Sequence, residues 1–116
     1  MFKSKKKAPV LCPSSVLFEI IQEDLQLGIC CDITFTWNGE KHSIGAWGEN
    51  GNTYQNLRFY YDKKIYSTLD ELKQNAMLNQ QPLITFPDKI LIRECDGCYP
   101  RSTPLLNAWY ESYEQN

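Results

Sequence analysis

The chain has 116 residues, of which 42% are hydrophobic and 22% are charged, a composition that is typical of one globular domain and excludes a largely disordered chain. Four of the twelve basic residues lie within the first ten positions, so the remaining 106 residues carry 8 basic and 14 acidic groups, a net charge of −6. This acidic balance disfavours general binding to nucleic acid, which requires clustered cations, and favours a partner protein with a basic surface.

Residues 1–13 are expected to form a flexible basic lead-in, and residues 14–116 a single α+β domain. The lysines of the lead-in are followed by no apolar run, so we expect neither a signal peptide nor a membrane span. The predicted location is therefore the reducing cytoplasm. In that compartment the five cysteines would be free thiols or metal ligands rather than disulfides.

An amphipathic helix is predicted directly after the lead-in. Its apolar residues recur at helical spacing, as Val16, Leu17, Ile20, Ile21 and Leu25. The hydroxyl of Ser14 or Ser15 is expected to cap the first turn, and Gly28 to end the helix in a left-handed conformation. The adjacent carboxylates Glu23 and Asp24 are assigned to the solvent-facing side of this helix, where solvation explains them.

The next segment predicts a β-hairpin. Apolar residues alternate with polar ones from Cys31 to Trp37, and the pair Asn38-Gly39 that follows is the preferred sequence for a two-residue type I′ turn. Such a turn fixes the register of the two strands. The expected pairs on the apolar face are Phe35 with His42, Ile33 with Ile44, and Cys31 with Ala46.

Two further strands and a helix are predicted in the middle of the chain. Alternation indicates a strand from Leu57 to Tyr61 and a short strand around Ile65 and Tyr66. Thr68 and Glu71 have the spacing of a capping box, in which each side chain accepts a hydrogen bond from the other residue's backbone N–H. A short helix is therefore expected to begin there and to continue to about Ala76.

The last predicted elements are a strand and a helix. The apolar, β-branched run from Lys89 to Glu94 indicates a fifth strand, and Thr103-Pro104 are suited to begin a final helix. One face of that helix would carry Leu105, Leu106, Trp109 and Tyr113. The order α-β-β-β-β-α-β-α predicts an antiparallel meander with helices packed on one face.

Two stretches of the sequence resemble small uncharacterised proteins of low-GC bacteria and their phages. These are LGICCDITFTWNGEKHSIGAW and FYYDKKIYSTLDELKQNAMLNQQPL, which lie within about residues 15–92. The resemblance implies an origin in a phage or mobile element. It also implies, by analogy, a role in binding host proteins, such as the anti-CRISPR-like inhibition of a defence nuclease.

Cys95 and Cys98 form a C-x-x-C motif, which can place two thiolates on one tetrahedral zinc ion. A structural zinc site usually has a second such pair, and the sequence contains none, although Cys30 and Cys31 are further candidates. Ordinary buried or surface thiols are the simpler interpretation. A thioredoxin-like redox role is a third, but no helix is predicted to begin at the motif and lower a thiol pKa.

The sequence offers no arrangement that is typical of an active site. His42 is the only histidine, and its predicted position opposite Phe35 indicates a packed side chain rather than a general base. A pair with Cys31 on the same face would lie in the middle of a strand, whereas catalytic groups more often lie on loops. Capping and solvation explain the acidic pair Asp70-Glu71.

Four residues are predicted to form a binding surface: Trp47, Tyr54, Arg58 and Tyr60. The predicted register places Trp47, Arg58 and Tyr60 away from the apolar face. They could contact a partner protein, stack on single-stranded nucleic acid, or form a second small cluster under the C-terminal helix. We therefore expect a non-enzymatic protein-binding domain that acts as an inhibitor or adaptor of a host protein that handles nucleic acid. The alternative is a small nucleic-acid-binding module with a structural zinc held by cysteines.

Overall fold

The computed structural model of the chain describes residues 10–96. In this part of the chain the elements are β1 (Val10–Pro13), α1 (Ser15–Gln26), β2 (Cys31–Trp37), β3 (Glu40–Trp47), the short 3-10 turn η1 (Glu49–Gly51), β4 (Arg58–Tyr61), β5 (Lys64–Tyr66), α2 (Leu69–Asn75), β6 (Met77–Leu78), β7 (Gln81–Pro82) and β8 (Lys89–Asp96). Six strands form one antiparallel sheet in the order β1-β8-β2-β3-β4-β5, and β6 and β7 form a separate two-stranded hairpin.

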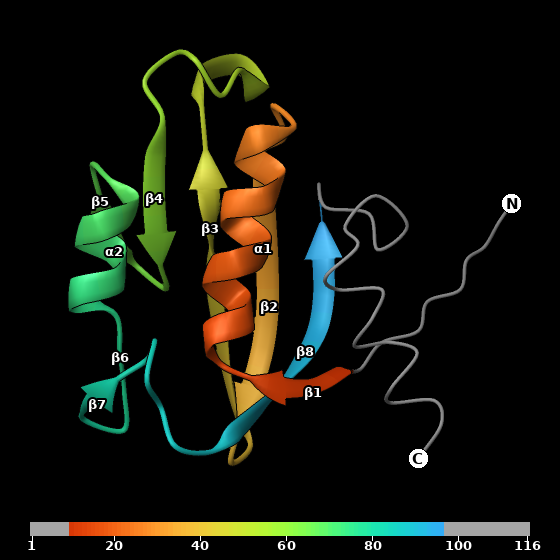
Figure 1. The fold of residues 1–116 in the computed structure, drawn as a ribbon, viewed down its shortest axis with the longest axis vertical. Helices are drawn as coiled ribbons and strands as arrows, with labels where there is room; N and C mark the ends of the chain where they lie inside the picture. Colours follow the sequence, from red (N-terminus) through yellow and green to blue (C-terminus); the bar gives the residue numbers. More distant parts are fainter. Residues whose placement is uncertain (1–9, 97–116) are drawn as a thin grey trace, which may run out of the picture.

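The predicted α+β class with an antiparallel sheet is confirmed, and both described helices lie in front of the same face of the sheet (Figure 1). Strands β2 to β5 follow one another as a meander. The last strand, β8, does not extend that meander beyond β5 but pairs with β2 and β1 on the opposite side. The predicted C-terminal helix lies outside the described residues.

The predicted hairpin is confirmed in every pair. Phe35 lies opposite His42, Ile33 opposite Ile44 and Cys31 opposite Ala46. Asn38 and Gly39 both have positive φ, 53° and 82°, as a type I′ turn requires. The hairpin therefore separates an apolar face, which is turned toward the helices, from a polar face on the other side.

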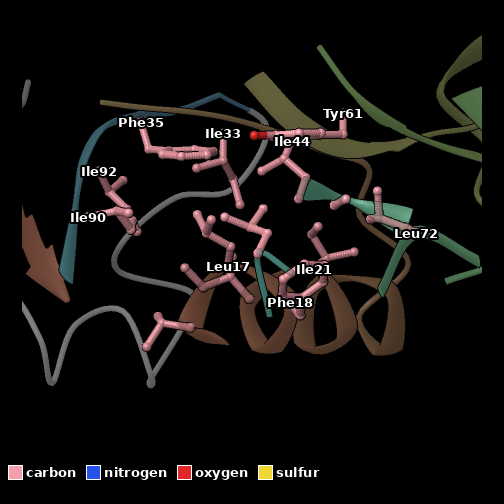
Figure 2. Packing of buried hydrophobic residues seen from close by; sticks show 14 of the residues in the cluster. Leu17, Phe18, Ile21, Ile33, Phe35, Ile44, Tyr61, Leu72, Ile90 and Ile92 are labelled. Carbon is pink, nitrogen blue, oxygen red and sulfur yellow. The ribbon is translucent and has the colours of Figure 1, made fainter. Parts of the chain in front are cut away.

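A single apolar core fills the space between the helices and the sheet (Figure 2). Leu17, Phe18 and Ile21 point from α1 toward Ile33 and Ile44 of the sheet, and all five are at most 2% exposed. The strands at either side complete the core with Ile90 and Ile92 from β8 and with Phe59 and Tyr61 from β4. Among residues 10–96 this core lies on the helix-facing side of the sheet, and neither described helix covers the other side.

The expectation of a flexible lead-in is wrong for residues 10–13, which form β1. Val10 and Cys12 are fully buried and pair with Ile92 and Ile90 of β8. The segment is short and follows a run of lysines, so local sequence gave no reason to extend the domain to it. Its burial depends on a strand almost eighty positions away.

Asp24 is also buried, at 0% exposed, and not on the solvent-facing side where it was expected. Its position explains this, because Asp24 lies four residues after Ile20 and seven after Leu17, which is one stripe of an α-helix. The helix is therefore apolar along this stripe except at its last turn.

The hydroxyl of Ser14 has a different role from the expected cap. It makes no side-chain capping bond to α1 and donates instead to the backbone carbonyl of Leu83, 69 positions away. Ser14 thus joins the start of α1 to the segment that leads into β8.

The helix α2 begins with the predicted capping residues. The backbone N–H of Glu71 donates to Thr68 Oγ1 at 3.1 Å. The carboxylate of Glu71 accepts from the backbone N–H of Ser67 at 2.9 Å rather than from that of Thr68, so the reciprocal bond is displaced by one residue.

Candidate functional site

The candidate site lies on the face of the sheet that the two described helices leave open. Residues of β2 to β5 alternate between the faces, so Asp32, Tyr60 and Ile65 project away from the core that contains Ile33, Phe59 and Tyr61. Within residues 10–96, α1 and α2 both pack on the other side of the sheet (Figure 1). Side chains of these strands therefore face away from both described helices on the open face (Figure 1).

A groove of about 590 Å³ is formed on this face by β3, β4 and β5 together with the start of β2. The side chains that characterise it are Cys30, Asp32, Trp47, Arg58, Tyr60 and Ile65. Trp47 is 49% exposed and Ile65 is 67% exposed, although each is large and apolar. Exposed apolar side chains that gather in a concave surface are typical of binding sites.

The centre of the groove depends on Gly45. Gly45 lies between Asp32 on β2 and Tyr60 on β4 in the strand register. A Cβ atom at this position would come within 2.1 Å of the Cys31 carbonyl oxygen and 2.8 Å of the Tyr60 hydroxyl oxygen. Because Gly45 has no side chain, Tyr60 can cross over β3 and donate a hydrogen bond from its hydroxyl to the carboxylate of Asp32. Three adjacent strands thus hold the Tyr60 ring in one orientation.

One end of the groove is formed by a cation on an aromatic ring. Trp47 and Arg58 are paired residues of β3 and β4, and the guanidinium carbon of Arg58 lies 5.8 Å from the Trp47 ring centroid. This separation is within the range of a cation–π contact. The contact holds both side chains at the surface, where each can also contact a partner.

The charges around the groove are balanced. Asp32 and Asp62 contribute two carboxylates, and Arg58 and Lys63 contribute two cations. The groove is therefore not a site for a strongly charged ligand. Its aromatic and aliphatic side chains are its main chemical feature.

The structure brings together three of the four residues that were predicted to bind a partner. Trp47, Arg58 and Tyr60 line the groove, whereas Tyr54, 86% exposed, lies in the loop before β4 and is not among the lining residues. Asp32 and Ile65 were missed. The alternation of β2 and the pairing of Ile65 with Tyr60 place both side chains on the outer face of the sheet.

Of the predicted cysteine pair, the structure describes Cys95 alone. Cys95 lies on β8 opposite Ile33 and is partly buried, whereas Cys98 lies outside the described residues. Elsewhere, Cys31 is buried in the core, and Cys30 Sγ accepts a hydrogen bond from the Gly48 N–H at 3.3 Å. Among residues 10–96 no group of three or more His, Cys, Asp or Glu side chains is arranged to hold a metal ion. The zinc hypothesis for Cys95 and Cys98 stays a prediction.

His42 has a packing position, as its predicted register implied. Its ring stacks on Phe35 and on Tyr61, with centroid distances of 5.4 and 5.8 Å. Its Nδ1 lies 2.8 Å from Asp62 Oδ2, and Asp62 Oδ1 accepts from the Ser43 N–H at 2.9 Å. The imidazole and the carboxylate together fix the turn that follows β4.

Tyr61, one of the rings in this stack, is only 6% exposed. Burial, together with the nearby charges of Asp62 and Glu40, raises the pKa of Tyr61 well above its ordinary value.

Cys31 lies opposite Ala46 and His42 opposite Phe35, so the cysteine and the histidine occupy different rows of the sheet. This arrangement lacks the neighbouring nucleophile and base that acyl-transfer chemistry requires.

A second hollow, of about 690 Å³, lies beside the turn between β4 and β5. Lys41, Lys63 and Lys64 line it together with Asp62 and Tyr66. Three lysines face one carboxylate here, so the hollow differs from the groove in carrying an excess of positive charge.

Fold and groove together define a small α+β domain whose antiparallel sheet is covered by helices on one face and carries an aromatic groove on the other. No protein-family model, curated protein or solved structure matches this chain. Neither helix in the described part of the chain has the length and apolar character needed to cross a membrane. The groove is therefore the feature of the described residues from which a function can be inferred.

Proposed function

We propose that this chain is a non-enzymatic protein-binding domain whose partner docks in the groove formed by Trp47, Arg58, Tyr60 and Ile65. The observation that carries the proposal is that these large side chains are held at the surface, next to one another, on a face that the described helices do not cover. Trp, Tyr and Arg are the residues most enriched at the energetic centres of protein interfaces. The Tyr60–Asp32 bond and the Trp47–Arg58 contact fix them before binding, which reduces the entropy lost on association.

The position of the only histidine supports a role in binding rather than catalysis. His42 is packed on two aromatic rings and engaged by Asp62, so it is a structural group of the β3–β4 region. The described residues that line the groove supply carboxylates, a guanidinium, aromatic rings and the thiol of Cys30, whose Sγ accepts from the Gly48 N–H, and no histidine is among them. Its composition is that of a contact surface.

The proposed partner is a host protein with a basic surface, one that handles nucleic acid and is inhibited or recruited by this domain. The acidic excess of residues 11–116 would attract such a surface over a distance and speed the encounter. Because the charges in the groove are balanced, the contact itself would be made by the aromatic side chains. The phage or mobile-element origin and the cytoplasmic location that the sequence led us to expect are parts of this proposal.

Affinity capture with the full chain, followed by binding measurements on the recovered partner, tests this proposal. Trp47→Ala should weaken binding by roughly 30-fold or more, because an aromatic side chain at the centre of an interface typically contributes at least 2 kcal/mol. Tyr54→Ala is the matched control, since Tyr54 is an exposed aromatic residue outside the groove and its loss should change the affinity less than threefold. Equal effects of the two substitutions would contradict docking in the groove.

The alternative, a nucleic-acid-binding module, is favoured by the hollow that Lys41, Lys63 and Lys64 line. It predicts that the chain binds single-stranded DNA or RNA with an affinity that falls steeply with salt. Replacing these three lysines with glutamine should then reduce the slope of the salt dependence, while Trp47→Ala leaves that slope unchanged. An affinity for DNA or RNA that does not change with salt concentration would contradict this alternative.

A further inference from the structure

The course of the chain after β8 bears directly on the groove. Asp96 is the last residue of β8 and pairs with Asp32, the first groove residue on β2. In Figure 1, β8 ends at the edge of the sheet where β2 begins and β3 ends. Residues 97–116 therefore start one strand away from the groove, and these 20 residues are long enough to reach across it.

The sequence of this segment has the pattern that an apolar groove accommodates. Thr103 and Pro104 are suited to begin a helix, and Leu105, Leu106, Trp109 and Tyr113 follow at the spacing of one helical face. A helix over residues 103–113 would be about 16 Å long. The distance from β2 to β5 across the sheet is about 14 Å, because neighbouring strands are about 4.8 Å apart. The predicted helix and the groove thus match in length and in apolar character.

We infer that, in the free protein, the groove on the open face is occupied by the chain's own C-terminal segment, with the apolar side of residues 103–113 against Trp47, Tyr60 and Ile65. Both surfaces are apolar. On the sheet, the side chains of Trp47 and Ile65 are 49% and 67% exposed, and the segment contains two leucines and a tryptophan. Covalent attachment makes this contact intramolecular, with an effective concentration in the millimolar range for a short connection. An external protein at cellular concentrations would have to compete with it.

This inference goes beyond the proposed function and does not depend on it, because it concerns the chain without any partner. If both hold, a partner must displace the segment or bind the composite surface that segment and groove form.

NMR spectroscopy of the full chain tests the inference. We expect NOEs between the side chains of Leu105, Leu106 or Trp109 and those of Trp47 or Ile65. The double substitution Leu105→Asp and Leu106→Asp should abolish these NOEs and shift the resonances of Trp47 and Ile65, while the core methyl groups of Ile33 and Ile44 keep their shifts. The last observation shows that the domain itself stays folded in the variant.

Leu27→Asp is the matched control, because Leu27 is 56% exposed and follows α1, away from the groove. It should leave the resonances of Trp47 and Ile65 in place. Absence of the NOEs in the unsubstituted chain, or no response of Trp47 to the double substitution, would overturn the inference. NOEs that appear only between differently labelled copies in a mixed sample would also overturn it, since the occupant would then be a second copy. None of these outcomes affects the Trp47→Ala test with an external partner.

Discussion

At the scale of single residues, the packing of the open face depends on the absence of a side chain at Gly45. Any side chain here would collide with the carbonyl oxygen of Cys31, a backbone atom that cannot move without disturbing β2. We predict that Gly45→Ala destabilises the domain by at least about 1–3 kcal/mol, the range that is typical of overpacking. Urea denaturation measures the change. Thr34→Ala, on the same face of β2, should cost less than about 1 kcal/mol, and a similar loss for the two variants would contradict the steric explanation.

The buried thiol of Cys12 makes the free energy of unfolding depend on pH in the alkaline range. Its thiol is buried beneath the β1–β8 pair, and burial, which outweighs the nearby charge of Lys89, raises its pKa from 9.0 to about 12. Between these values the unfolded chain releases the thiol proton before the folded chain does, so rising pH favours unfolding. Below pH 9 both states keep the proton and this group adds no pH dependence.

We therefore predict that the free energy of unfolding falls between pH 9 and 10 with a slope that approaches about 1.4 kcal/mol per pH unit from Cys12 alone. Tyr61, whose pKa is raised in the same direction, adds to the loss only above its unfolded value of 10.0. Urea denaturation at a series of pH values measures the slope. The Cys12→Ala variant, whatever its absolute stability, should have a flatter profile from pH 9 to 10, and an unchanged profile would contradict the assignment.

At the scale of elements, the start of α2 depends on its first turn more than on its packing. The helix has seven residues and buries Leu72 alone in full, so its N-terminal hydrogen bonds are a large share of what holds it. We predict that Thr68→Ala, which removes the acceptor for the Glu71 N–H, destabilises the domain by about 1 kcal/mol.

The control for this prediction is Glu71→Gln. Glutamine keeps an oxygen that accepts from the Ser67 N–H, so this variant should lose less than about 0.5 kcal/mol in the same urea measurement. A loss from Glu71→Gln as large as that from Thr68→Ala would indicate that charge, rather than hydrogen bonding, stabilises the turn.

Elements with a complete local signal were predictable from the sequence. The hairpin of β2 and β3 has strict alternation and an Asn-Gly turn, and both α1 and the capped α2 have helical spacing with recognisable ends. The hairpin of β6 and β7 was not predicted, because Asn79 and Gln80 form its turn with φ of 52° and 66° and glutamine is not a usual residue there. Its two-residue strands are also too short to show alternation.

The same distinction applies to the candidate site. The register of one hairpin was enough to place Trp47 on the outer face, and alternation placed Arg58 and Tyr60 beside it. The groove itself could not be derived, because it depends on the passage of Tyr60 over Gly45 to reach Asp32. That contact joins three strands and has no signature within any one of them.

At the scale of the whole molecule, the sheet order was the least predictable feature. The sequence of β8 alone does not predict that this strand lies between β1 and β2. Pairing between strands that are distant in sequence depends on which apolar faces remain to be buried. The order makes β2 a central strand, with β8 on one side and β3 on the other. It leaves β1 and β5 as the two edges.

We predict that amide hydrogen exchange follows this order. The amides of β2 and the adjoining halves of β3 and β8 should exchange only through global unfolding, whereas those of β5 and of the β6–β7 hairpin should exchange through local opening at much lower free energy. Exchange measured by NMR at increasing denaturant separates the two classes. Protection of β5 equal to that of β2 would show that an additional segment covers that edge.

The position of β8 also has a consequence for how the polypeptide acquires its structure during synthesis. Translation releases β1 and β2 from the ribosome first, yet the strand that must lie between them is Lys89–Asp96. The early hairpin and α1 can associate as they emerge, but Val10 and Cys12 have no partner until about 80 residues later. Completion of the sheet is therefore a late event in the nascent chain, and a chain that ended before Lys89 would leave the flank of β2 exposed to aggregation.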